Sequence, residues 1–301
     1  MSAAVLPRDT GDRMLPRPVE AAVEFLRLLA KRPSGLIGFA GIVFFLLLAF
    51  VVPLFVPNQE QGDITAIYNT PSADHLLGTD NAGRDVLNQI VQGGKEIIGV
   101  ALITAFLTTL IATTIGAVSG LVGGKLDNLL VGFADVVLTV PPLIVLIVIS
   151  ALARPTNFVA LALILSSLNW AGLMRQVRAQ VLTLKERDYV EAARSLDLGL
   201  GHIIFWEILP NMRSYIVIHF VLAMTGAIYA QVALIILGLV PFGGKNWALM
   251  LYFANSQGAF YFKDAFWFVF SPILAIVLLQ LSLVLFVNAL EDIFNPRLRS
   301  A

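Results

Sequence analysis

The sequence predicts an all-α polytopic membrane protein with six transmembrane helices, and two observations carry this fold class. The chain of 301 residues is 58% hydrophobic and only 13% charged, whereas a soluble domain typically has about 25% charged residues. Crossing a bilayer takes roughly 20 apolar residues, and six stretches are long enough and poor enough in charge to do so. They cover residues 34–59, 97–122, 136–153, 155–174, 214–244 and 265–290.

These spans divide the chain into segments whose side of the membrane follows from their basic residues. With the N-terminus inside, fifteen of the 20 lysines and arginines fall in cytosolic segments, as the excess of positive charge on the inside requires. Both termini are therefore expected in the cytosol of a prokaryotic cell, with the chain in its inner membrane. The segments are a cytosolic N-terminal segment (1–35), the first transmembrane helix (36–57), an extracytoplasmic loop (58–92), a five-helix transmembrane domain (93–291) and a cytosolic tail (292–301).

Small residues and prolines predict how two of the spans are built. Ala112, Gly116, Gly120 and Gly124 recur every four residues, and such a row of small residues lets membrane helices approach closely. The Pro–Pro pair at 141–142 removes two backbone donors inside the third span. We expect a kink or break there.

The extracytoplasmic segments contain two features of their own. In the loop 58–92, Asp80 or Asn81 could cap a short helix that lies on the outer interface. The loop 241–264 is rich in aromatic residues, which either form an interfacial belt or meet a solute or a delivery protein. The aromatic residues of that loop are Phe242, Trp247, Tyr252, Phe253, Phe260, Tyr261 and Phe262.

Polar residues within the spans are the candidates for a translocation path, because polar groups at membrane depth are usually functional. Asn169, His219, Gln231 and Gln280 are therefore possible path-lining residues. For His219 alone, a hydrogen bond to a neighbouring helix is the simpler explanation.

Several chemistries are excluded by what the sequence lacks. It has no cysteine, and its histidines, at positions 75, 202 and 219, show no metal-ligand spacing. "GLVPFGGKN" lacks the Gly-Lys-Ser/Thr end of a phosphate-binding loop, and zero net charge gives no reason to expect a nucleic-acid partner. We expect no catalytic, metal or cofactor-binding residues. A secondary transporter would need inverted repeats and intramembrane ion ligands, and neither is visible.

The stretch "DYVEAARSLDLGLGHIIFWEILPN", residues 188–211, predicts a cytosolic helix–turn–helix. Glycines at 199 and 201 permit a sharp turn, and a second helix, 203–209, is expected to end at Pro210. One side of the first helix is small or apolar, which suits contact with another protein. The residues of that side are Tyr189, Val190, Ala193 and Leu196, and Ala192 lies beside them.

The same stretch resembles the EAA loop of type I ABC importer permeases, written E-A-A-x3-G-x9-I-x-L-P. Glu191, Ala192, Ala193, Leu209 and Pro210 match that pattern, whereas Asp197 takes the place of the glycine and Glu207 that of the isoleucine. "LLGTDNAGRDVL" and "LEDIFNPRL" are similar to segments of the C-type chains of dipeptide, oligopeptide and nickel importers. The resemblance covers residues 36–299.

The resemblance implies a non-catalytic subunit with several partners. These are a second permease chain, two cytosolic ATPase subunits that bind ATP, an extracytoplasmic solute-binding protein and the lipid bilayer. The coupling loop, 185–211, would bind the ATPases through Tyr189, Val190, Glu191, Ala192, Ala193, Arg194, Leu196, Asp197, Gly199, Gly201, Leu209 and Pro210. Peptides are the expected solute. Oligosaccharides are the alternative, because aromatic rings suit sugar faces, and nickel would prefer histidine or carboxylate ligands that the spans do not offer.

Overall fold

The computed structural model describes residues 25–58, 61–240 and 245–294, and these contain helices and loops but no β-strand. Five helices are long and apolar enough to cross a membrane, and a bent helix pair gives a sixth crossing if it counts as one span. The prediction of an all-α protein with multiple membrane spans is therefore confirmed. The spans are α2 (Pro33–Phe50), α3 (Val86–Val122), the pair α4 (Gly124–Thr139) and α5 (Pro142–Ala153), α6 (Phe158–Leu184), α10 (Arg213–Ile236) and α12 (Phe266–Phe294).

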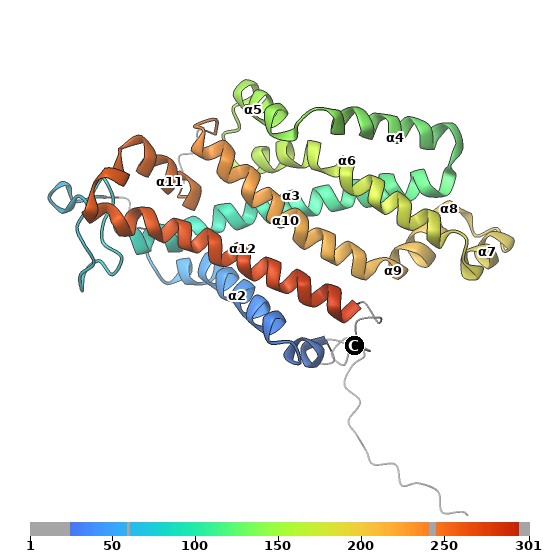
Figure 1. The fold of residues 1–301 in the computed structure, drawn as a ribbon, viewed down its shortest axis with the longest axis horizontal. Helices are drawn as coiled ribbons and strands as arrows, with labels where there is room; N and C mark the ends of the chain where they lie inside the picture. The colour runs from blue at the N-terminus through green and yellow to red at the C-terminus, as the bar shows by residue number, and fades with distance from the viewer. Residues whose placement is uncertain (1–24, 59–60, 241–244, 295–301) are drawn as a thin grey trace, which may run out of the picture.

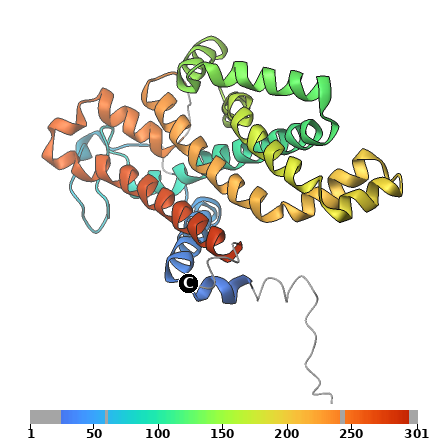
Figure 2. The same ribbon diagram turned by 45° about the vertical axis from the view of Figure 1, so that its right-hand side comes forward.

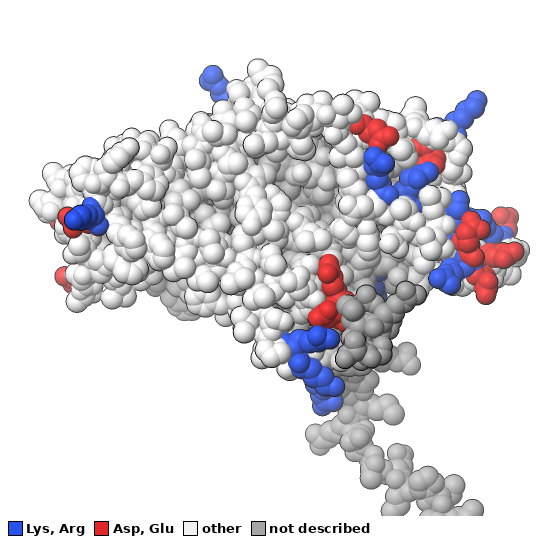
Figure 3. Space-filling view, in the orientation of Figure 1, with Lys and Arg blue, Asp and Glu red and all other residues white. Residues whose placement is uncertain are grey.

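The long helices run back and forth between two ends of the molecule (Figures 1 and 2). We call these the α7 end and the α11 end, after the short helices α7 (Asp188–Ser195) and α11 (Trp247–Ser256) that lie there. The start of α2 and the finish of α12 meet through an ion pair between Arg32 Nη1 and Asp292 Oδ2, 3.1 Å apart. On the face shown in Figure 3, most charged side chains gather toward the α7 end and beside the start of α2. The charge-poor middle is what a lipid-spanning region requires.

Helix α3 is the centre of the bundle and packs against α2, α6, α10 and α12. Its row of small residues lies against α6. A Cβ on Gly116 would come within 2.7 Å of the carbonyl oxygen of Met174, and one on Gly120 within 2.9 Å of the Val181 side chain. Ala112 is fully buried in the same cluster. Gly124 does not continue the row, because α3 ends at Val122 and Gly124 opens α4 with φ near +65°.

The third crossing is broken where the prolines predict it. Helices α4 and α5 meet at an angle of 83° across Pro141. Two ion pairs fasten α4 to α6: Asp127 Oδ1 with Arg178 Nε at 2.5 Å, and Asp135 Oδ1 with Arg175 Nη1 at 2.8 Å. These pairs explain why α6 extends to Leu184, ten residues beyond the predicted span, since its arginines are held by a neighbouring helix.

The prediction of a short interfacial helix within residues 58–92 is wrong in two respects. Its cap is Asp85 rather than Asp80 or Asn81, since Asp85 Oδ1 accepts the Asn88 amide at 2.6 Å. The helix is also no separate element, because it is the first part of α3, which has 37 residues. At 1.5 Å per residue α3 is about 55 Å long, far more than a bilayer core needs. Its first turns are buried beneath Trp247, whose indole donates to Ile90 O at 2.7 Å.

Candidate functional site: the 188–211 hairpin

At the α7 end, residues 188–211 form a helical hairpin that protrudes from the bundle (Figures 1 and 2). Its first arm is α7. The second arm begins at Gly199, earlier than predicted, and continues past Pro210 to Asn211. It consists of α8 (Gly199–His202), a π-helix (Ile203–Ile208) and α9 (Leu209–Asn211).

The turn between the arms is made by Asp197 with φ of 51°. The Asp197 amide donates to Arg194 O at 2.9 Å, and the Leu198 amide donates to Ala193 O at 3.2 Å. This pair of bonds is the Schellman motif, in which the residue after the helix cap adopts the left-handed conformation. Asp197 stands where the EAA pattern has glycine, so the structure supplies the physical reason for that glycine. Aspartate tolerates the conformation better than most residues do. Gly199 also has a positive φ, of 75°, as the predicted turn glycine should, whereas Gly201 has no positive φ and does not form the turn.

The second arm continues past Pro210 because its backbone hydrogen bonds change from the α-helical to the π-helical pattern. The Leu209 amide bonds to Ile204 O, five residues back, which is the π-helical pattern. Proline lacks an amide hydrogen and would interrupt an ordinary α-helix. The Asn211 side chain donates to Glu207 O at 2.6 Å and so satisfies one carbonyl in this region. Leu209 is partly buried, whereas Pro210 is exposed.

One side of the hairpin belongs to the protein's own core. Val190 is fully buried and Ala193 is 3% exposed. Both pack with Ile203 and Ile208 of the second arm in a cluster that includes Val181 of α6. The interpretation of Val190 and Ala193 as partner-facing residues is therefore wrong. A helix that needs small residues to pack against its own chain has the same sequence pattern as one that docks on another protein.

The opposite side of the hairpin exposes large apolar side chains. Trp206 is 71% exposed and Leu196 is 70% exposed. Glu191, Ala192 and Arg194 are exposed on the first arm. We call the large apolar side chains of this side the outer hairpin face; its members are Leu196, Leu198, Leu200, Phe205 and Trp206. Sequence reasoning found only Leu196 among them. The adjacent pair Phe205–Trp206 was the available signal, because successive helical residues point about 100° apart and the narrow buried side of a short helix seldom holds two large rings.

At the α11 end, the "LLGTDNAGRDVL" segment forms a different kind of structure. Asp80 is fully buried. Its Oδ1 accepts the amides of Ala82 and Arg84 at 2.8 and 2.9 Å, and its Oδ2 accepts Arg84 Nε and Gln89 Nε2 at 2.8 and 2.9 Å. Asp85 Oδ2 lies 2.9 Å from His75 Nδ1. Asp80 is thus the organising residue of the loop rather than a helix cap.

Two glycines and one further carboxylate complete this loop. Gly78 and Gly83 both have φ of 71°, and a Cβ at Gly83 would clash with Asp63 O. Asp63 accepts the hydroxyl and the amide of Thr65 at 2.6 and 2.8 Å. These hydrogen bonds hold the pKa of Asp63 below its usual value. The loop is therefore built from specific backbone turns, which suits a rigid support.

The four predicted path residues do not come together. Gln231 is fully buried and donates to Ile97 O at 2.8 Å, and Gln280 is 5% exposed and donates to Thr225 O at 3.2 Å. Both link neighbouring helices. Asn169 is exposed on α6 and bonds to Leu165 O of its own helix. His219 lies against Tyr215, with ring centroids 4.2 Å apart.

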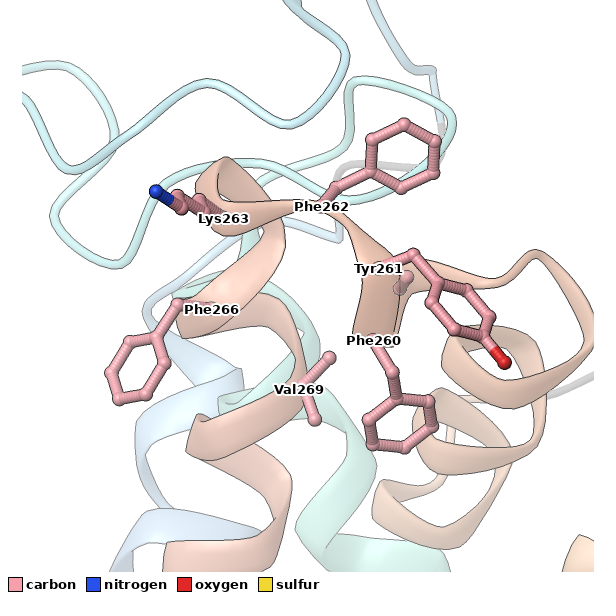
Figure 4. Close-up of a pocket in the computed structure, with 7 residues that line it drawn as sticks. Phe260, Tyr261, Phe262, Lys263, Phe266 and Val269 are labelled. Carbon is pink, nitrogen blue, oxygen red and sulfur yellow. The ribbon is translucent and has the colours of Figure 1, made fainter.

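The aromatic residues that the structure describes in the 241–264 loop range from buried to exposed, with Tyr252 and Phe253 half-buried. Trp247 is fully buried, whereas Tyr261 is 91% exposed and Phe260 and Phe262 are more than half exposed. Phe242 lies outside the described residues. The exposed rings border a hollow of about 450 Å³. Figure 4 shows the rings of Phe260 and Phe266 on either side of Val269, and Tyr261 and Phe262 extending away.

Within residues 25–58, 61–240 and 245–294, no three histidine, aspartate or glutamate side chains lie close enough together to hold a metal ion. The outer hairpin face offers apolar area beside exposed charges, the composition of a transient interface.

Comparison with known proteins gives a consistent picture. Residues 112–300 match the family described as binding-protein-dependent transport system inner membrane component. A putative peptide permease protein of Brucella abortus is 34% identical over 262 residues, which is 85% of this chain and 86% of that protein. The dipeptide transport system permease protein DppC of Bacillus subtilis is 30% identical, over 91% of this chain and 85% of its own length. The oligopeptide transport system permease protein OppC of the same organism is 29% identical, over 88% and 86%.

Proposed function

The chain belongs to the family of binding-protein-dependent transport system inner membrane components, and on that premise we propose that it is a permease subunit for peptide import. It is a multi-pass subunit of an ABC importer and, in this proposal, catalyses no reaction itself. The relatives named as peptide, dipeptide and oligopeptide permeases support peptides as the solute.

The outer hairpin face is the observation that supports a partner at the α7 end. In this proposal it binds a cytosolic ATPase subunit, so the α7 end and both termini lie in the cytosol. A second permease chain completes the path, and an extracytoplasmic binding protein delivers the solute at the α11 end. Closure of two ATP-bearing subunits would move the hairpin and thereby the helices to which Val190 and Ala193 anchor it.

The docking assignment is tested with Trp206→Ala. Because Trp206 is 71% exposed, its truncation should leave the fold intact, and loss of a buried aromatic anchor at an interface costs about 2 kcal/mol or more. The dissociation constant for the ATPase should therefore rise about thirtyfold, since each 1.4 kcal/mol is a factor of ten, and less ATPase should co-purify. The matched control is Trp267→Ala, an exposed tryptophan on α12 at the other end, which should leave the ATPase bound. Equal co-purification with both variants would contradict the assignment.

The solute is tested by uptake in cells with and without this chain. Labelled peptides of two to five residues should accumulate only when the chain is present. Cello- and xylo-oligosaccharides test the alternative that the solute is an oligosaccharide. The exposed rings at and beside Tyr261 support that alternative. Sugar uptake that depends on the chain, with peptide uptake independent of it, would replace peptides by oligosaccharides as the solute.

A further inference from the structure

One side of α3 is left uncovered by the rest of the chain. Its residues recur at steps of three and four, so they share one side of the helix. Phe106 is 59% exposed and Leu110 is 51% exposed, whereas Ala101 and Ala105 on the opposite side are fully buried. We call this side the α3 stripe; it consists of Glu96, Gly99, Ile103, Phe106 and Leu110. From Glu96 to Leu110 it covers about 21 Å at 1.5 Å per residue, most of the thickness of a bilayer core.

The α3 stripe is hollowed at both of its ends. Toward the α11 end, Glu96, Gly99 and Ile103 line a hollow of about 440 Å³, flanked by Phe50 and Phe158 at the neighbouring ends of α2 and α6. Toward the α7 end, α3 and α10 enclose a hollow of about 400 Å³ whose lining includes Phe106, Leu110 and Phe220. Apart from the adjacent residues and backbone of α3 itself, no heavy atom lies within 4 Å of where a Cβ on Gly99 would stand, so the floor of the first hollow is open.

Glu96 is the unusual member of the α3 stripe. Its side chain is half-buried, and its Oε2 atom is enclosed by the protein without a hydrogen-bond partner among the described residues. Lys95 lines the same hollow. Adjacent residues on a helix do not face each other, and no ion pair between these two is recorded in the described part of the chain. An unsatisfied carboxylate is costly to keep away from water, so the hollow that Glu96 lines suits a cationic group or water.

We propose that the α3 stripe is this subunit's share of the translocation path and that Glu96 binds the ammonium group of the incoming solute. The proposal rests on peptide import, because a free peptide carries an ammonium group at one end and a carboxylate at the other. Glu96 and Lys95 line the same hollow, which therefore offers one group of the opposite charge for each end of the peptide. Below them the α3 stripe is apolar, so the solute is released onward rather than held.

The path thus differs from the one that Asn169, His219, Gln231 and Gln280 suggested. Gln231 and Gln280 are occupied in bonds between helices. The Oε1 atoms of Gln231 and Gln280 are also left without a hydrogen-bond partner among the described residues, but neither glutamine lines the two hollows beside α3. Glu96 differs because it combines an unbonded oxygen with a place in the wall of a hollow of suitable size.

The test uses the assembled transporter in proteoliposomes and the absence of native cysteine from this chain. Gly99→Cys places a thiol in the hollow. Its labelling is measured with a cationic reagent, 2-(trimethylammonium)ethyl methanethiosulfonate, and an anionic one, 2-sulfonatoethyl methanethiosulfonate. Adding Glu96→Gln should lower the cationic-to-anionic rate ratio about fivefold, because the local negative charge is removed. Trialanine should protect the thiol when Glu96 is present, and N-acetyl-trialanine should not.

Two results would overturn the proposal. Absence of labelling by both reagents would mean that the α3 stripe faces lipid. An unchanged rate ratio would mean that Glu96 is neutralised by a basic residue of the partner permease. Gly226→Cys is the matched control, since this exposed glycine of α10 also has room for a Cβ but lies off the α3 stripe; it should show no ratio change with Glu96→Gln. Peptide uptake is measured separately, so failure of peptide import as such is distinguished from failure of this site.

Discussion

The loop at the α11 end and the hairpin at the α7 end both contain family-like sequence motifs, but they use them differently. In the loop, the motif residue Asp80 is fully buried and its two oxygens accept four hydrogen bonds from within the loop and α3. In the hairpin, the motif residues alternate between the core and the surface. Ala193 is buried while its neighbour Ala192 is exposed.

The difference shows that a motif residue can specify a shape rather than a contact. The loop motif produces a rigid turn in which no motif residue has to meet a partner. In the hairpin, Val190 and Ala193 fix the arms to α6 and so position the outer hairpin face. In the proposed docking, the surface offered to a partner is formed mainly by exposed residues that the EAA pattern leaves unspecified, such as Phe205 and Trp206.

Among the variants that test this comparison, Asp80→Ala should have the largest effect on the stability of the protein. It leaves the guanidinium of Arg84 and the amide of Gln89 without their carboxylate, and removing one partner from a buried charged pair costs about 3–5 kcal/mol. We expect a marked loss of folded protein in the membrane and a lower thermal denaturation temperature in detergent. Asp74→Ala is the matched control, because Asp74 is exposed in the same loop and its loss should change stability by less than about 0.5 kcal/mol. Equal stability of the two variants would refute the central role of Asp80.

Substitutions of the adjacent alanines of the hairpin should have the next largest effect. Ala193→Arg forces a long charged side chain into a packed cluster, which should cost several kcal/mol and expose the hairpin to proteolysis. Ala192→Arg should leave the hairpin protease-resistant but reduce solute-stimulated ATP hydrolysis, because Ala192 lies on the exposed side. Limited proteolysis and ATPase assays on both variants separate folding from docking. A protease-resistant Ala193→Arg hairpin would contradict the assignment of Ala193 to the core.

The sequence predicts the membrane class well because hydropathy reports burial in lipid directly. It also predicts the break at Pro141, because a proline lacks the amide hydrogen-bond donor and so interrupts the helix at its own position. It fails at Asp80 and Ala193 because burial of a single side chain depends on distant segments. Asp80 needs Gln89 on the next helix, and Ala193 needs Ile203 on the returning arm. The same reason applies to Gln231, which is fully buried because its side chain is bonded to a carbonyl 134 residues away in sequence.

Asp197→Gly should have the smallest effect and the most local one. Asp197 has φ of 51°, a conformation in which a side chain is strained and glycine is not. Relief of this strain stabilises the turn, but glycine also makes the unfolded chain more flexible, which offsets part of the stabilisation. We therefore expect a net stabilisation of the turn of about 0.7 kcal/mol. Hydrogen exchange measures this directly at the Leu198 amide, which is bonded to Ala193 O. Exchange there should slow about threefold, and Asp197→Ala, which keeps a Cβ but loses the short polar side chain, should accelerate it. If exchange at Leu198 is unchanged in both variants, the left-handed residue does not limit opening of the turn, and the glycine of the EAA pattern requires another explanation.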